Sequence, residues 1–180
     1  MTNESAIDTL CTWCFAQLLT GEVRIMQPIV YDDLVIRPYE HGSDDDKKGY
    51  ILRNKMLSHS TGVDDRVLRS IFTIHDSEAD QTKLGAFIGD SMVGTLSLAP
   101  MENGSVRIKQ FAVTDKLQGK GIGKKLLAYA HATAKELGYK RIELSARQNV
   151  IGFYAKAGYV VMGELFGPPT NILQQMYIDL

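Results

Sequence analysis

Apolar and polar residues alternate along the chain in a way that predicts short helices and strands. Apolar positions within 5–20 recur at close to helical spacing, which predicts a helix with one apolar face. Gly21 ends this helix, and Pro28 prevents its continuation. Two further short helices are predicted over 50–59 and 64–72. The polar run from Gly42 to Gly49 is predicted to be a solvated turn.

Strand patterns follow these first helices. Leu34–Glu40 is the first predicted strand, and 83–88 with 92–98 predicts a hairpin that turns at 89–91. A long strand covers 104–114. Simple alternation divides its side chains into two faces, with Val106, Ile108, Gln110 and Ala112 on one and Arg107, Lys109, Phe111 and Val113 on the other.

A glycine-rich turn and a long helix ending near Gly138 come next. Strands are then predicted over 140–146, 159–165 and 173–180, with a short helix over 150–158 between the first two. A strand, helix and strand between Val106 and Ala146 form a βαβ crossover, so its two strands lie parallel. The fold class is therefore α/β (or α+β): a mixed, mostly antiparallel sheet flanked by helices, with one central parallel pair.

Composition narrows the function further. The chain has 180 residues and a formal net charge of -1, which suits one moderate-sized domain and disfavours a nucleic-acid-binding protein. No apolar run reaches the roughly 20 residues of a membrane span, and the first residues have no basic stretch of a signal peptide. Two cysteines make no disulfide framework, so a cytoplasmic location is expected.

Cys11 and Cys14 form a C-x-x-C motif inside the apolar helical run. A redox motif is expected between a strand and a helix, and a zinc site needs two further ligands. Packing of two small apolar side chains explains the pair best, with a redox role as the alternative. No metal site is predicted.

The turn from Leu117 to Lys125 contains three glycines among lysines, a pattern typical of phosphate binding. A P-loop and a dinucleotide fingerprint would both require glycine at 124, where the chain has Lys124. The pattern Q-x-x-G-x-G matches fully from Gln118 to Gly123. Small residues let a backbone approach a diphosphate, and the free N–H groups of a helix start favour its charge. The alternative is a helix start that needs glycines only for its turn.

These residues resemble the GNAT superfamily of N-acetyltransferases. The segments "FAV", "QGKGIG", "ELGY" and "SARQNVIGFYAKAGY" occur in the order expected for that family, and the resemblance covers about 31–180. Details such as "LRNKML" and "MYIDL" are most similar to the ElaA-type branch. This predicts two parts: an N-terminal helical extension over 1–30 and a GNAT domain over 31–180.

The resemblance implies acetyl transfer from acetyl-CoA to a primary amine of a small molecule or peptide. It assigns the pantetheine arm and the thioester oxygen to the backbone of one strand, the pyrophosphate to the glycine turn, and a further cofactor hydrogen bond to one asparagine. In this chain those cofactor-binding residues are Phe111, Ala112, Val113, Gln118, Gly119, Lys120, Gly121, Ile122, Gly123, Lys124 and Asn149. Tyr154 takes the position of the catalytic acid that protonates the leaving sulfur.

The general base is not identified. Many relatives have a glutamate on the strand before the turn, but 106–110 contains no acid, so either a water chain removes the proton or the base comes from the early helices. Glu102, His59 and His75 are candidates by chemistry only, and His131 is expected to be exposed. The segment 166–172 is expected to border the acceptor cleft. An alternative function is a non-catalytic acyl-CoA-binding module that regulates a partner, and a homodimer is also conceivable.

Overall fold

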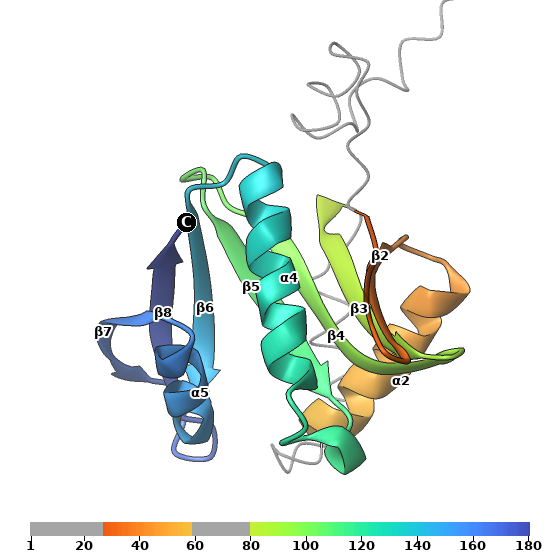
Figure 1. Ribbon diagram of the computed structural model, residues 1–180. Coiled ribbons are helices and arrows are strands. Elements are labelled where there is room, and N and C mark those ends of the chain that lie inside the picture. The colour runs from red at the N-terminus through yellow and green to blue at the C-terminus, as the bar shows by residue number, and fades with distance from the viewer. Residues whose placement is uncertain (1–26, 59–79) are drawn as a thin grey trace, which may run out of the picture.

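The structure is a computed structural model that describes residues 27–58 and 80–180. The predicted helices over 5–20 and 64–72, the C-x-x-C motif, His59 and His75 lie outside these residues. One twisted eight-stranded sheet organises the described chain (Figure 1). Its strand order is β1-β2-β3-β4-β5-β6-β8-β7. The strands are β1 (Ile29–Tyr31), β2 (Leu34–Tyr39), β3 (Thr82–Ile88), β4 (Ser91–Pro100), β5 (Val106–Val113), β6 (Arg141–Arg147), β7 (Val160–Phe166) and β8 (Leu173–Asp179).

The predicted fold class is confirmed. Neighbouring strands run antiparallel except β5 and β6, which are parallel. Strand β1 was not predicted, because three residues are too few to establish an alternation. The division of the chain into an extension over 1–30 and a domain over 31–180 remains a prediction.

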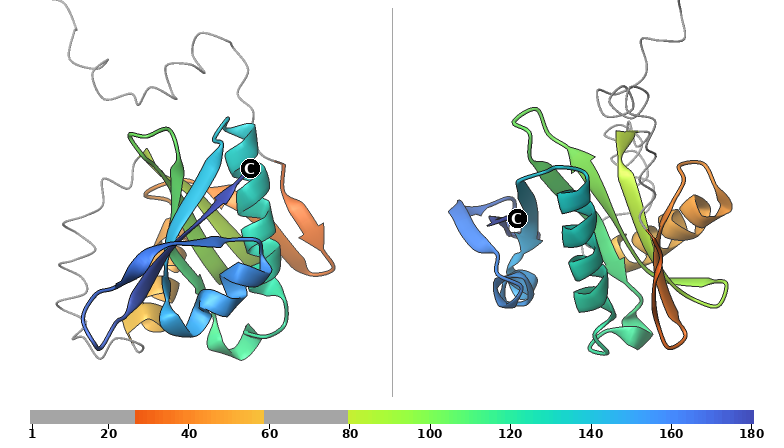
Figure 2. Two further views of the ribbon diagram at one scale, coloured as in Figure 1. Left: turned by 90° about the vertical axis from the view of Figure 1, so that its left-hand side faces the viewer. Right: turned by 45° about the horizontal axis from the view of Figure 1, so that its top comes forward.

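Helices cover both faces of this sheet. The helices α4 (Ile122–Glu136) and α5 (Ile151–Lys156) lie on one face, and α2 (Asp44–Ser58) lies on the other (Figure 2). Helix α4 turns one apolar side to the sheet, and Leu126 and Ala130 are completely buried there. That packing forms the centre of the core. Apolar burial of this kind is the main favourable contribution to folding.

The solvated turn predicted over Gly42–Gly49 is wrong, because α2 begins at Asp44. The Ser43 hydroxyl oxygen accepts a hydrogen bond from the Asp46 N–H at 3.2 Å and caps the helix. Acidic side chains in the first turn also favour a helix N-terminus. Lys47 and Lys48 each form an ion pair with the aspartate three residues earlier. The polar run is therefore the first turns of a helix, in which Asp44 and Lys47 are exposed and Asp46 is buried.

The alternation predicted along β5 is also wrong beyond Lys109. Lys109 pairs with Ser97 and Ala112 pairs with Thr95, so two β5 residues lie opposite the single residue Leu96. Gln110 is the extra residue and has a positive φ of 54°, as in a β-bulge. The Oε1 atom of Gln110 accepts a hydrogen bond from Arg53 of α2 at 2.5 Å. Phe111 and Val113 therefore face α4, together with Val106 and Ile108.

The parallel pair β5–β6 is short. In the described strands it consists of Val106 with Ile142 and Arg107 with Glu143. Beyond these two pairs the strands diverge, as Figure 1 shows for the green β5 and the blue β6. The second half of β5 therefore has a backbone edge that does not pair with β6, and such an edge can bind an extended ligand.

No helix in the described residues is long and apolar enough to cross a membrane. No group of three or more His, Cys, Asp or Glu side chains in that part of the chain is arranged to hold a metal ion.

Candidate functional site

The glycine turn leads from the end of β5 into α4. Gly119 and Gly121 have φ values of 76° and 84°, which side-chain-bearing residues rarely adopt. Gly121 is the N-cap of α4 and leaves the first amides of the helix without a side-chain cap. The first bond of the helix runs from the Lys125 N–H to the Gly121 carbonyl at 3.0 Å. The amides of Ile122, Gly123 and Lys124 therefore have no partner within the helix and can bind an anion.

The predicted side chains of this turn differ in accessibility. Gln118, Gly119, Lys120, Gly121 and Lys124 are exposed, and the Ile122 side chain is buried in the core. Only the backbone of Ile122 can therefore contact a ligand. The Lys125 ammonium lies 4.3 Å from the centre of the Tyr31 ring, in a cation–π contact.

Gln118 connects this turn to the diverging strand. Its Nε2 donates a hydrogen bond to the Val113 carbonyl at 3.0 Å. The next residue, Thr114, donates its N–H to Val93 of β4 at 2.9 Å. Because successive strand residues direct their backbone groups to opposite sides, the Val113 N–H points away from β4, towards the diverging edge.

An aromatic group joins this edge to α5. The ring of Phe111 contacts Phe153 and Tyr154, with centroids 6.0 and 6.4 Å apart, in edge-to-face geometry. Tyr159 contacts Tyr154 at 5.5 Å. An added Cβ at Gly123 would lie 3.7 Å from both Phe111 and Phe153, so the group also packs against the start of α4. The structure thus brings together Phe111, Tyr154 and the glycine turn.

Tyr154 is 8% exposed, and burial raises the pKa of its phenol to about 12. A phenol with that pKa keeps its proton throughout the physiological range, so it can donate a hydrogen bond or a proton there. The hydroxyl of the neighbouring Tyr159 lies 2.9 Å from Nε2 of His131. The His131 side chain is partly buried, so the expectation that it is exposed is wrong.

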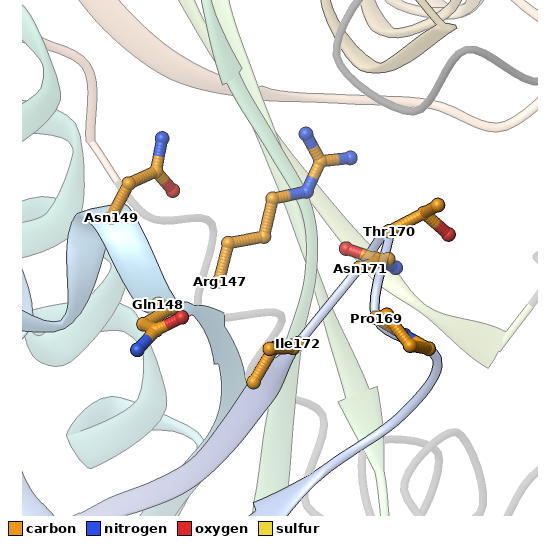
Figure 3. Close-up of a pocket in the computed structure, with 7 residues that line it drawn as sticks. All are labelled: Arg147, Gln148, Asn149, Pro169, Thr170, Asn171 and Ile172. Atoms are coloured by element: carbon orange, nitrogen blue, oxygen red, sulfur yellow. The ribbon is translucent and has the colours of Figure 1, made fainter.

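Asn149 lines a pocket, and the sequence predicted only some of the residues that form it. The pocket has a volume of about 480 Å³, and its lining residues come from the end of β6 and from the β7–β8 loop: Arg147, Gln148, Asn149, Pro169, Thr170, Asn171 and Ile172 (Figure 3). The loop was expected to border an acceptor cleft. Arg147 was not predicted, although its position directly before Gln148 and Asn149 in the motif was a usable signal.

No carboxylate on β5 faces the site. Glu102 lies in the turn before β5, at the opposite end of the strand from Val113, so it is not near the diverging edge. Glu143 is buried at the closed end of the β5–β6 pair, where it bonds to Ser105 at 3.0 Å and lies 3.5 Å from Arg107. Among the described residues, neither Glu102 nor Glu143 is therefore placed to act as a base at the diverging edge.

Comparison with known proteins decides the family. The model of the acetyltransferase (GNAT) family matches residues 50–159, which is more than half of the chain. The chain belongs to the GNAT acetyltransferase family. Members of this family transfer acetyl groups from acetyl-CoA, so the GNAT chain is assigned to the acyltransferases.

Solved GNAT structures share this fold. Escherichia coli ElaA has a TM-score of 0.67 and 16% identity, and the match covers 80% of this chain and 98% of ElaA. A GNAT family acetyltransferase from Elizabethkingia anophelis with acetyl-CoA bound has a TM-score of 0.60 at 17% identity, over 83% of this chain and all of the other. A Bacillus subtilis acetyltransferase in complex with CoA has a TM-score of 0.61 at 23% identity, covering 81% and 97%.

Two features of this GNAT chain suit the same ligand chemistry. The amides at the start of α4 fit a diphosphate, and the unpaired edge of β5 fits an extended arm that contains amides. Coenzyme A has both parts. The fit rests on backbone groups of the glycine turn and of Val113, whose directions follow from the hydrogen bonds of Lys125, Thr114 and Gln118 described above.

Proposed function

We propose that this protein is an N-acetyltransferase that moves the acetyl group of acetyl-CoA to a primary amine of a small molecule or peptide. The observation that carries the proposal is the contact of Tyr154 with Phe111. This contact holds a protonated phenol beside the unpaired edge of β5, next to the glycine turn.

Each residue then has a defined task. The amides of Ile122, Gly123 and Lys124 bind the diphosphate, and exposed Lys120 and Lys124 add positive charge. The Val113 N–H donates to the acyl oxygen, which gains negative charge during attack. Bound acetyl-CoA supplies the acetyl group as an activated thioester.

The proton balance is simple. The neutral amine nitrogen forms a bond to the acetyl carbon, the carbon–sulfur bond breaks, and the amine loses one proton to solvent. Tyr154 gives its phenolic proton to the sulfur and regains one from water. Burial suits this task, because a raised pKa keeps the phenol protonated until it is needed.

The first test is calorimetric titration of the protein with acetyl-CoA, with NADH and ATP as controls. We expect selective binding of acetyl-CoA. A screen of amines by thiol release then compares wild type with Tyr154→Phe. The variant is expected to bind acetyl-CoA normally and to lose about 10²- to 10⁴-fold in kcat, the usual contribution of general acid catalysis. Equal turnover by both proteins would remove Tyr154 from the mechanism.

A further inference from the structure

Arg147 is a cation in the lining of the pocket that also contains Asn149. The other described lining residues are uncharged: Gln148, Asn149, Pro169, Thr170, Asn171 and Ile172. Figure 3 shows the Arg147 guanidinium extending between Asn149 on one side and Thr170 with Asn171 on the other. Arg147 is partly buried, and that burial lowers the pKa of its guanidinium. A guanidinium has five N–H donors, so it can donate hydrogen bonds to an anionic ligand in the pocket.

Arg147 lies at the same level along the sheet as Phe111, which contacts Tyr154. Phe111 and Arg147 each lie four residues beyond the last β5–β6 pair, Arg107 with Glu143. Because the strands are parallel, both residues are at the carboxyl ends of β5 and β6, where these strands diverge. Asn149, which the family assigns to the cofactor, lines the same pocket.

Arg147 and the diphosphate site lie on opposite faces of the sheet. Ile142, Leu144 and Ala146 are buried in the core, and Ser145 between them is exposed. By alternation, Arg147 lies on the face of Ser145 and Glu143, opposite to that core. Helix α4 covers the core face and α2 lies on the other side (Figure 2). An acceptor that enters on the side of Arg147 therefore does not compete with the diphosphate.

A second cation lies on this face. Lys109 pairs with Ser97, and Thr95 on the same face of β4 bonds to the hydroxyl of Tyr39 at 2.8 Å. An added Cβ at Gly49 of α2 would lie 2.7 Å from the same hydroxyl, so these side chains all point towards α2. Lys109 and Arg147 are thus two cations on the α2 side of the diverging strands, and either can attract an anionic group of a substrate.

The pocket wall is preorganised. The Gln148 N–H bonds to the Ile172 carbonyl at 3.1 Å, and the Asn171 N–H bonds to the Pro168 carbonyl at 2.8 Å. At Gly167, with φ of 98°, an added Cβ would lie 2.6 Å from the Asn171 carbonyl oxygen. The close approach of the loop to itself at this point therefore requires glycine. A wall that is already ordered loses little entropy on binding.

We propose that Arg147 binds a carboxylate of the acceptor, so that the preferred substrates are amines that also carry a carboxylate, as amino acids do. The planar guanidinium can donate two parallel hydrogen bonds to a carboxylate and fix its orientation. This inference rests on the proposed acetyltransferase function and names the substrate class of that site. Arg147 is a specificity-determining residue and takes no part in the proton transfers.

The experiment compares amines in matched pairs that differ only in the carboxylate: phenylalanine with phenethylamine, tyrosine with tyramine, and β-alanine with ethylamine. Phosphoethanolamine tests phosphate in place of carboxylate. Turnover is measured by thiol release, and binding of each amine to the CoA-saturated protein is measured by calorimetry. The variants are Arg147→Gln, Arg147→Lys and, as a matched loss of charge outside the pocket, Lys156→Gln on exposed α5.

In wild type, we expect at least one carboxylate amine to exceed its partner in kcat/KM. Arg147→Gln should raise the KM of that amine by about 10- to 100-fold, the effect of losing hydrogen bonds to a charged group. The KM of neutral amines, the affinity for acetyl-CoA and the melting temperature should be unchanged. Arg147→Lys should keep part of the preference, because an ammonium retains the charge without the planar fork. Lys156→Gln should behave as wild type.

Three results would overturn the inference: no binding by any carboxylate amine, an equal loss for both members of each pair in Arg147→Gln, or weaker acetyl-CoA binding in that variant. A preference for phosphoethanolamine alone would also exclude a carboxylate. These outcomes are distinct from failure of the proposed function, which would appear as no acetyl-CoA binding by wild type. In that event, titration of the amines into the ligand-free protein still decides whether the pocket selects carboxylates.

Discussion

The rings of Phe111 and Tyr154 meet edge to face where β5 and β6 diverge, with 6.4 Å between their centroids. One ring belongs to a strand and the other to a helix that follows the next strand along the chain. Their contact fixes the phenol beside a backbone edge that has no partner on β6.

The pH dependence of turnover should show the burial of Tyr154. An acid must be protonated to act, so kcat falls as the pH rises through its pKa. An ordinary tyrosine has a pKa near 10, whereas burial raises the pKa of Tyr154 to about 12. We therefore expect kcat, measured by thiol release, to stay level from pH 8 to pH 10. A decline centred near pH 9 that is absent in Tyr154→Phe would contradict the assignment.

Gly121 should be required for both stability and cofactor binding. Its φ of 84° lies in the left-handed region, where a side chain costs about 1–2 kcal/mol. Gly121→Ala should lower the free energy of unfolding by that amount, measured in urea. It should also weaken acetyl-CoA binding by about tenfold or more, because the amides at the start of α4 move.

Gly152 provides the matched control for this substitution. It lies in α5, and an added Cβ would have no heavy atom within 4 Å. Gly152→Ala should stabilise the protein by about 0.5–1 kcal/mol, because it removes the backbone freedom of a helical glycine. If both variants lose acetyl-CoA affinity equally, the special role of the Gly121 turn is wrong.

A buried ion pair should be needed for stability. Lys83 of β3 has a fully buried side chain, and its Nζ lies 2.7 Å from Asp46 of α2. Lys83→Met would leave the Asp46 carboxylate buried without this cation, at a cost of about 3–5 kcal/mol in the free energy of unfolding. Lys47→Met removes an exposed lysine one position from Asp46 and should leave that free energy unchanged within error. Equal effects in urea titrations would contradict this.

His131 should make stability depend on pH in the acidic range. Burial, followed by the nearby charge of Lys135, lowers the pKa of His131 below its ordinary value near 6.5. Below pH 6.5 the unfolded chain therefore binds the proton more readily than the folded protein, and stability falls as the pH falls. From pH 7 to pH 5 the free energy of unfolding should decrease more in wild type than in His131→Gln. If the free energies of unfolding of the two proteins changed in parallel with pH, folding would not lower the pKa of His131.

The order of the elements could be read from the sequence because long strands and α4 have strong periodic patterns. The turn at Gln118–Gly123 could also be predicted, because a tight local turn requires glycines. The first turns of α2 were missed because charged side chains hid a capped helix start. The bulge at Gln110 was missed because simple alternation assumes an unbroken ladder, and the Arg53 side chain that bonds to Gln110 comes from a different element.

The candidate site divides in the same way. Tyr154 and the glycine turn belong to continuous motifs, so a single stretch of sequence indicates them. The pocket at Arg147 joins the end of β6 to a loop more than 20 residues later, and it forms only through the pairing of β6 with β8. Composition and spacing do not reveal such a strand pairing, so the pocket at Arg147 could be found only from the structure.

The shortness of the β5–β6 pair has a mechanical consequence. In the described strands, two residue pairs join β1–β5 to β6–β8, and both lie at one end of the sheet. Elsewhere the two parts are held together through the apolar core, which contains side chains of both parts and of α4. We therefore expect the open end to change its width more easily than the paired end, and a ligand that fills the open end to reduce this motion. Amide exchange in β5 and β6 should then slow when the ligand is bound, even where no atom changes its average position.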